Sequence, residues 1–262
     1  MKREKILWII ALILVIIVIA GLGYGYYRKA TMKPENPIAT MEVENFGTIK
    51  IELYPELAPQ TVANFTTLAN RGFYNGLTFH RIVKDFMIQG GDKNGNGQGS
   101  ATTADLKDDG DETEYTIKGE FISNGVNENK LKFEEGILGM ARSDYTSYSP
   151  TLTEESYNSG SSQFFIMTKA NSSLNGYYTA FGKVIEGLDI VHKIEGTEVK
   201  AADDAAESGN SEVSTPVNPP KITSLTVETF GEDYGLPETL EPFDYMTWMY
   251  KQYGLDPSTM SN

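Results

Sequence analysis

The sequence contains no cysteine and only two histidines among its 262 residues. Without cysteine the chain has no disulfide, no thiolate nucleophile and no sulfur ligand for zinc, and two histidines leave little room for a histidine-rich metal site. Positive charge is also scarce, because 22 Lys and Arg residues stand against 36 Asp and Glu residues, for a formal net charge of -14. Nucleic-acid phosphates attract clustered Lys and Arg, so this excess of acid argues against nucleic acid as a partner.

Charge is absent from residues 6–27, which follow a basic N-terminus at residues 1–5. At about 1.5 Å per helical residue, this apolar run spans roughly the hydrocarbon core of a bilayer. Trp8 and Tyr24, near its two ends, are typical of interfacial anchors. We therefore predict a single-pass transmembrane signal-anchor helix in the cell membrane, with the rest of the chain on the extracytoplasmic side. Secretion after signal cleavage is the alternative.

The next segments, after a proline-containing spacer at residues 28–37, have regular structural periods. Residues 41–44 and 49–53 alternate apolar and polar side chains around a turn, which predicts a β-hairpin with one buried face. Residues 58–68 have the apolar spacing of an amphipathic helix. Pro59 suits the first turn of that helix, where its missing N–H costs nothing.

Residues 79–92 mix bulky apolar and polar side chains and end in a Gly-Gly-Asp turn. Side chains of an extended chain alternate between two faces, so Arg81, Val83, Phe86 and Gln89 can meet on one exposed surface of a sheet. Such a surface would combine one fixed cation, one amide and several apolar walls. This combination indicates a binding or catalytic surface rather than a plain core strand.

This segment, with Phe79-His80-Arg81 followed by Phe86-Met87-Ile88-Gln89-Gly90-Gly91-Asp92, resembles the signature of the cyclophilin family of peptidyl-prolyl isomerases. Further segments resemble cyclophilin blocks in the same order: Gly139–Ser143, Asn158–Ile166, Leu174–Gly176 and Phe181–Val184. The resemblance covers about Ile38 to Thr229, and several spaced motifs in one order make a chance match very rare.

The resemblance implies a mainly β fold, in which a closed antiparallel eight-stranded barrel is capped by two helices. The helix at 58–68 would be one cap, and residues 187–194, which also have helical spacing, would be the other. The isomerase domain would span residues 38–230 and follow the N-terminal transmembrane helix. Beyond the resemblance, residues 231–262 would form an acidic, aromatic C-terminal extension, in which the helical spacing of Tyr245, Trp248 and Met249 predicts a short helix that docks on the barrel.

The resemblance also implies the activity, which is the cis-trans isomerisation of Xaa-Pro peptide bonds. Rotation about such a bond breaks no covalent bond, so we expect no cofactor and no metal. Arg81 would be the catalytic residue that stabilises the twisted amide. The implied substrate-binding residues are Phe86, Met87, Gln89, Ala141, Arg142, Gln163, Phe165, Leu174 and Tyr178. The expected partners are proline-containing unfolded or exported polypeptides, and the expected state is a monomer.

Three positions depart from the pattern of many cyclophilins. Ser173 stands where many have Trp, so an aromatic contact used for cyclosporin is missing and we expect weak inhibition. Tyr178 stands where many have His and would leave a flat aromatic wall that preserves activity. Arg142 replaces the usual Asn, which is tolerable if only the backbone of this residue contacts the substrate.

Other polar segments have simpler interpretations. Asp92–Gly97 matches the first half of a calcium-binding loop, but Thr103 stands where a bidentate Glu is needed, which favours a Gly-rich turn. The acidic segments 104–114 and 201–214 are predicted to be solvated or flexible loops. The alternative function is a non-catalytic proline-peptide-binding chaperone or scaffold module at the membrane surface. A hydrolase is disfavoured because no Gly-x-Ser-x-Gly elbow is present.

Overall fold

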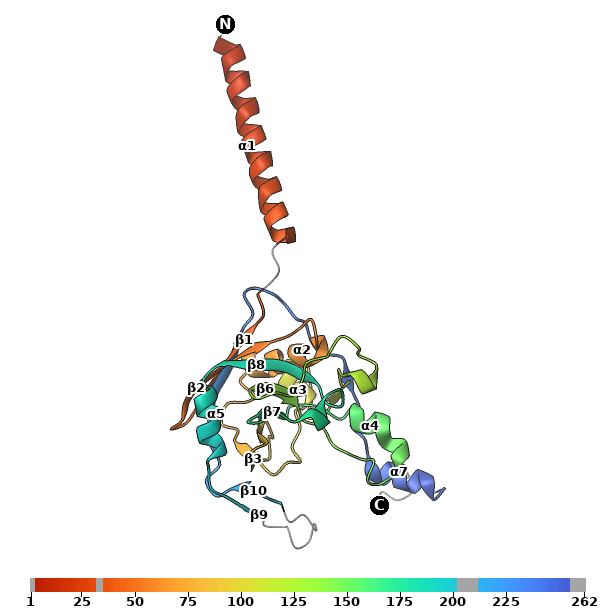
Figure 1. Cartoon of the computed structure of the whole chain (residues 1–262). Helices are drawn as coiled ribbons and strands as arrows, with labels where there is room; N and C mark the ends of the chain where they lie inside the picture. Colours follow the sequence, from red (N-terminus) through yellow and green to blue (C-terminus); the bar gives the residue numbers. More distant parts are fainter. Residues whose placement is uncertain (1–2, 32–34, 202–211, 255–262) are drawn as a thin grey trace. The chain divides into compact units, whose positions relative to one another are not determined.

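The computed structural model describes residues 3–31, 35–201 and 212–254 (Figure 1). The chain divides between Glu35 and Asn36 into two compact units. Part of the predicted spacer, residues 32–34, lies outside the described residues.

The first unit contains one long helix, α1 (Arg3–Thr31), which extends beyond both ends of the predicted segment 6–27. Its stretch Leu7–Gly25 has a mean hydropathy of 2.8 and no buried residues. By length and composition this helix could cross a membrane, and a signal sequence near an N-terminus has the same properties.

The second unit is built on one curled antiparallel sheet (Figure 1). From edge to edge its strands are β11 (Ile222–Glu228), β1 (Ile38–Val43), β2 (Gly47–Leu53), β8 (Ala180–Glu186), β6 (Ile137–Met140), β7 (Phe164–Met167), β4 (Met87–Gly90) and β3 (Phe79–Val83). The predicted hairpin is confirmed, because β1 pairs with β2 in register from Ile38–Glu52 to Val43–Gly47. The predicted antiparallel set of eight strands is confirmed as well.

The predicted closure of the barrel is not confirmed. In the described part of the chain, the edge strands β3 and β11 form no ladder, and their ends meet at a single bridge between Thr78 and Lys221. A backbone hydrogen bond from Phe79 N to Pro220 O, 2.9 Å long, supports this contact. Ile222, the first residue of β11, also donates to Leu77 O at 2.8 Å and accepts from Gly76 N at 2.7 Å, but this pairing does not continue along the two strands. The sheet is therefore a half-barrel.

Both predicted capping helices are present. Helix α2 (Pro59–Asn70) begins with Pro59 and buries Val62, Phe65 and Leu68 against the inner face of the sheet. The Phe65 ring contacts three other rings, with centroids 5.2 to 5.6 Å away. Helix α5 (Leu188–Glu195) buries Val191 and Ile194 in the same core.

A second, smaller apolar cluster lies on the other face of the sheet. Its buried members are Met87, Phe133, Ile137, Phe165, Met167 and Ala180. Neighbouring side chains of a strand point to opposite faces, so Phe164 belongs to the main core whereas Phe165 belongs to this cluster. The second cluster forms the floor of the site described below.

Short elements complete the second unit. They are α3 (Thr103–Leu106), β5 (Thr116–Ile117), η1 (Ile122–Asn124), η2 (Pro150–Leu152), α4 (Thr153–Tyr157), η3 (Ser172–Leu174), β9 (Val199–Ala201), β10 (Val213–Pro216), β12 (Thr239–Leu240) and α7 (Tyr245–Gln252). Most of the predicted acidic excursion, residues 202–211, lies outside the described residues. The two ends of that excursion pair as strands β9 and β10, which the sequence did not predict.

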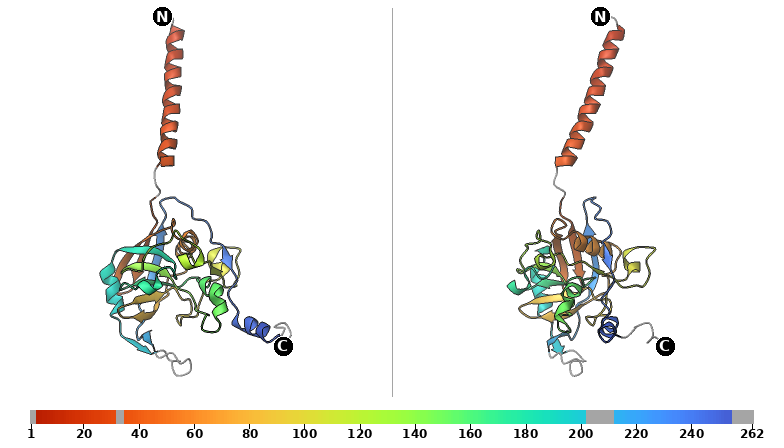
Figure 2. Two further views of the ribbon diagram at one scale, coloured as in Figure 1. Left: turned by 45° about the vertical axis from the view of Figure 1, so that its right-hand side comes forward. Right: turned by 90° about the vertical axis from the view of Figure 1, so that its right-hand side faces the viewer.

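The C-terminal extension contains the predicted helix, but this helix docks on a loop rather than on the sheet. Phe243 contacts Tyr145, and Tyr245 at the start of α7 contacts Tyr148, each with ring centroids 4.6 Å apart. Figure 2 shows the blue helix α7 at the margin of the second unit, away from the sheet. Upstream of the helix, β12 pairs with β5, with Thr239 opposite Ile117. The extension is thus held against the rest of the second unit both by strand pairing and by ring contacts.

Candidate active site

Nine of the ten predicted site residues line one opening of about 200 Å³ on the outer face of the sheet. They are Arg81, Phe86, Met87, Gln89, Ala141, Arg142, Phe165, Leu174 and Tyr178. The tenth, Gln163, lies next to the opening and contacts Gln89. The structure therefore brings the predicted residues together, while their individual roles stay predictions.

The floor of the opening is apolar and tightly packed. Met87 and Phe165 are only 1% and 5% exposed. The Phe165 ring stacks on Phe133 at 5.5 Å and meets the Tyr178 ring edge-on at 6.0 Å. Gly139 lies opposite Phe165 in the sheet, and a Cβ at this glycine would come within 2.4 Å of the Phe165 ring. Only glycine leaves room for the ring at this position.

Arg81 lies on β3 directly across from Gln89 on β4. Its Nη1 is 3.3 Å from Gln89 Oε1 and 3.8 Å from the sulfur of Met87, so this nitrogen faces the apolar floor. The opposite edge of the guanidinium, Nε and Nη2, donates to both carboxylate oxygens of Glu212, at 2.7 and 2.8 Å. The pKa of Glu212 is lowered, chiefly by these hydrogen bonds from Arg81. Its carboxylate is therefore charged at neutral pH.

Sequence reasoning missed Glu212. The residue lies in the acidic segment predicted to be a flexible loop, and no motif distinguishes it from its acidic neighbours. The ion pair joins positions 131 residues apart, so no local pattern could have revealed it.

The two glutamine amides form a continuous chain of hydrogen bonds with Arg81. Gln89 Nε2 donates to Gln163 Oε1 at 2.9 Å, and Gln163 Nε2 donates to the carbonyl oxygens of Gly97 and Gly99. The carboxylate of Asp92 holds this glycine-rich loop, because it accepts hydrogen bonds from the backbone N–H groups of Asn94 and Gly97. The loop therefore orients Gln163.

Within residues 3–31, 35–201 and 212–254, no group of three His, Cys, Asp or Glu side chains is placed to hold a metal ion.

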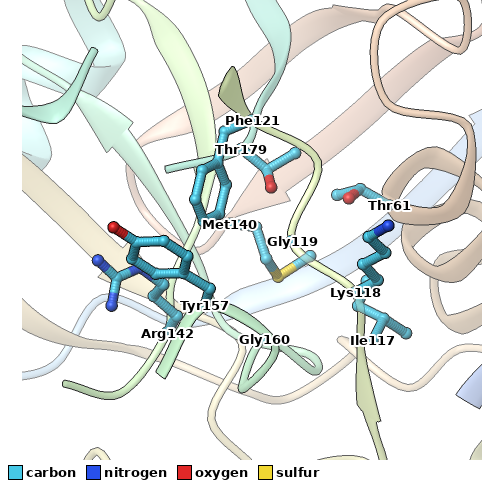
Figure 3. Close-up of a pocket in the computed structure, with 10 residues that line it drawn as sticks. All are labelled: Thr61, Ile117, Lys118, Gly119, Phe121, Met140, Arg142, Tyr157, Gly160 and Thr179. Atoms are coloured by element: carbon cyan, nitrogen blue, oxygen red, sulfur yellow. The ribbon is translucent and has the colours of Figure 1, made fainter. Parts of the chain in front are cut away.

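Arg142 is held by protein groups on several sides. Its guanidinium lies 4.4 Å from the centre of the Tyr178 ring and 5.2 Å from that of Tyr157. It also donates to the carbonyl oxygens of Tyr177 and Ser143, at 3.1 and 3.0 Å. Figure 3 shows Arg142 beside the Tyr157 ring at a cavity of about 10 Å³, which has room for one water at most. Substrate contact through the Arg142 backbone stays a prediction.

A second cavity of about 340 Å³ adjoins the first and shares Gln89, Ala141 and Arg142 with it. Gln163 lines this cavity, and so do Pro242 and Phe243 from the C-terminal extension. The contribution of the extension was not predicted, because nothing in the sequence indicates that β12 pairs with β5.

Ser173 and Tyr178 are the other two positions that depart from the pattern of many cyclophilins. Ser173 lies in η3 and is exposed, and its hydroxyl donates to Asn171 Oδ1 at 2.7 Å. Tyr178 lines the opening, and its role in substrate binding stays a prediction. His80 is buried on β3, and burial lowers its pKa, so its imidazole is neutral at neutral pH.

Comparison with known proteins agrees with this geometry. The family model for cyclophilin type peptidyl-prolyl cis-trans isomerases matches residues 38–227. Peptidyl-prolyl cis-trans isomerase B of Bacillus subtilis is 39% identical over 157 residues, which cover 60% of this chain and 90% of that protein. A probable peptidyl-prolyl cis-trans isomerase of Brucella suis is 34% identical over 209 residues, covering 79% of this chain and 91% of that protein.

A solved structure with a similar fold is a cyclophilin type isomerase of Cryptosporidium parvum, determined in the presence of the dipeptide Ala-Pro. Its TM-score is 0.55 at 26% sequence identity, and the match covers 73% of this chain and 98% of that chain.

Proposed function

Because this chain belongs to the cyclophilin-type peptidyl-prolyl cis-trans isomerase family, we propose that it performs the family's reaction at the opening lined by Arg81, with the proline ring on the floor formed by Met87 and Phe165. The observation that carries this proposal is the position of Arg81 Nη1, 3.8 Å from the Met87 sulfur and beside the Gln89 amide. A charged donor thus lies directly over an apolar recess.

The reaction needs only a site that binds the twisted amide better than either planar isomer. Rotation about a peptide bond crosses a barrier of about 18–20 kcal/mol, and uncatalysed Xaa-Pro exchange takes tens to hundreds of seconds. When the amide twists, resonance is lost and the prolyl nitrogen becomes a better hydrogen-bond acceptor. A donor that bonds this form alone lowers the barrier, and about 5.5 kcal/mol corresponds to a 10⁴-fold acceleration.

The groups around Arg81 would bind the proline ring and the backbone of the substrate. The buried floor at Met87 and Phe165 takes the proline ring out of water, which strengthens a hydrogen bond from the guanidinium. Gln89 and Gln163 are already oriented by their hydrogen bonds to each other, so they can hold backbone groups of the substrate on one side of the proline. One part of the polypeptide then stays fixed while the other part turns.

The substrate is a polypeptide rather than a free dipeptide. The second cavity continues from the first through Gln89, Ala141 and Arg142, so residues flanking the proline can extend into it. The Ala-Pro dipeptide named for the Cryptosporidium parvum structure supports proline peptides as the ligand class. Proline-containing unfolded chains have the required shape, because their backbone is extended and accessible.

We base a proposal for the place of action on α1. Its stretch Leu7–Gly25 supports a single-pass anchor in the cell membrane, with the isomerase unit on the extracytoplasmic side acting on exported polypeptides. Secretion after cleavage of this segment is the alternative, and the mass of the mature chain purified from membrane and culture medium separates the two.

The activity is tested with the full chain in detergent and a short Ala-Pro peptide whose cis and trans forms give separate NMR signals. If the chain is an isomerase, the rate of cis-trans exchange between these signals should increase in proportion to its concentration. Peptide binding in a titration without any acceleration would instead select the non-catalytic chaperone or scaffold module. Absence of both binding and acceleration would contradict both functions.

A further inference from the structure

The guanidinium of Arg81 is held along one edge by a carboxylate from a distant segment. Its Nε and Nη2 donate to Oε1 and Oε2 of Glu212 at 2.7 and 2.8 Å, which is a side-on pair of parallel hydrogen bonds. Such a pair fixes the plane of the guanidinium as well as its position. The two side chains are 33% and 36% exposed, so solvent reaches the pair only in part.

Glu212 is itself held in place. It directly precedes β10, which pairs with β9 and packs against β3, the strand that carries Arg81. The buried Ser214 on β10 adds a side-chain hydrogen bond to the Glu212 carboxylate. The carboxylate is therefore held by a residue of β10 as well as by the arginine.

The ion pair leaves the substrate-facing side of the arginine open. Glu212 lines neither of the two cavities of the site. The Nη1 group of Arg81 points away from Glu212, toward Gln89 and the sulfur of Met87. The carboxylate thus holds the guanidinium from behind without occupying the space of the proline or of the chain that flanks it.

We propose that Glu212 is a positioning residue for the isomerase reaction, which holds the Nε and Nη2 edge of Arg81 so that Nη1 faces the Xaa-Pro amide. This inference rests on the proposed role of Arg81. A free arginine side chain populates many rotamers, and ordering it during the reaction would add to the barrier. Glu212 orders it before the substrate arrives, as a preorganised site requires.

A double-mutant cycle in the full chain in detergent tests the proposal. We expect Glu212→Ala to lower kcat/KM by about 10-fold, mainly through kcat, because a donor misplaced by about 1 Å can cost up to 100-fold. Glu212→Gln keeps the size but offers a single acceptor atom, so its loss should be smaller. In an Arg81→Ala background, Glu212→Ala should cause no further loss, because it acts only through the arginine. Glu198→Ala, an exposed carboxylate next to β9, is the matched control and should keep the wild-type rate.

A spectroscopic signature separates positioning from a purely structural role. The Arg81 Nε–H bonded to Glu212 should give a distinct, slowly exchanging ¹⁵N NMR signal that disappears in Glu212→Ala while the backbone spectrum keeps its dispersion. An unchanged or higher kcat/KM in Glu212→Ala would overturn the inference, and so would an equal loss in the Arg81→Ala background. Wild-type kcat/KM in Arg81→Ala alone would instead overturn the proposed function, on which the inference rests.

Discussion

A methyl group at position 139 would test how tightly the floor of the active site is packed. A Cβ on Gly139 would lie 2.4 Å from Phe165 Cζ and 2.7 Å from Phe133 Cε1. Carbon atoms in favourable contact lie about 3.5–4.0 Å apart, so the Phe165 ring must move by roughly 1 Å or more. Gly139 pairs with strands on both sides, β7 and β8, so the backbone cannot easily withdraw. The ring then has to move toward the opening.

The expected effects of Gly139→Ala follow from this overlap. Overpacking of a well-packed core costs about 1–3 kcal/mol. For a domain of this size each kcal/mol lowers Tm by roughly 2–4 °C, so Tm should fall by roughly 2–12 °C. The displaced ring narrows an opening of only about 200 Å³, and we expect kcat/KM to fall by about 10- to 100-fold, mainly through a higher KM.

Thermal unfolding and the peptide exchange assay measure these two effects in one preparation. Gly196→Ala is a suitable control, because a Cβ at the end of α5 would meet only carbonyl oxygens at 3.4 and 3.6 Å and the backbone there has φ of -73°. The control should keep the wild-type KM. If Gly139→Ala kept both the wild-type Tm and the wild-type kcat/KM, the packing argument for the floor would be refuted.

Three further predictions concern regions around the site. The pKa of His192 is raised, chiefly by its hydrogen bond with Glu195 and also by that with Glu135. The stability from protonated His192 is therefore complete below the unfolded pKa of about 6.5 and lost as pH rises through the folded value. His192→Gln should flatten this decline in urea unfolding between pH 5.5 and 8.5, and an equally steep decline in the variant would contradict the assignment. Removal of residues 237–262 deletes Pro242 and Phe243, which line the second cavity. We therefore expect KM to rise for a peptide long enough to fill that cavity and to stay unchanged for a short Ala-Pro peptide. Equal effects on both peptides would count against a role of the cavity in substrate binding. Ser173 is exposed and offers no aromatic surface, so inhibition by cyclosporin should be weak, and nanomolar affinity for the purified protein would show that prediction to be wrong.

The sequence predicts those parts of the fold that depend on local patterns. The alternation in residues 41–44 and 49–53 specifies the β1–β2 hairpin, because a shift of one residue would expose its buried face. Pro59 and the apolar spacing behind it specify the start and the buried face of α2. Most site residues come together because they lie on or directly beside strands that are neighbours in the sheet, namely β3, β4, β7 and β6. Leu174 in η3 and Tyr178 after it come instead from the segment between β7 and β8.

The parts that were not predicted depend on contacts between distant and weakly patterned segments. The pairing of β9 with β10 joins strands of only three and four residues, which are too short for their alternation to predict a strand. The two-residue strands β5 and β12 are too short to carry any period. Closure of the barrel was inferred from resemblance alone, whereas the edge strands β3 and β11 meet only at a bridge between Thr78 and Lys221, a long-range contact that no local pattern indicates.

The most direct test of the account is the separation of kcat from peptide affinity in Arg81 variants. If Arg81 bonds only the twisted amide, Arg81→Ala should lower kcat by about 100-fold, close to 2.7 kcal/mol, while the peptide Kd changes by less than about threefold. Arg81→Lys should recover only part of kcat, because an ammonium group cannot reproduce the fork. A wild-type kcat in Arg81→Ala, or a loss that appears only in Kd, would contradict the central claim.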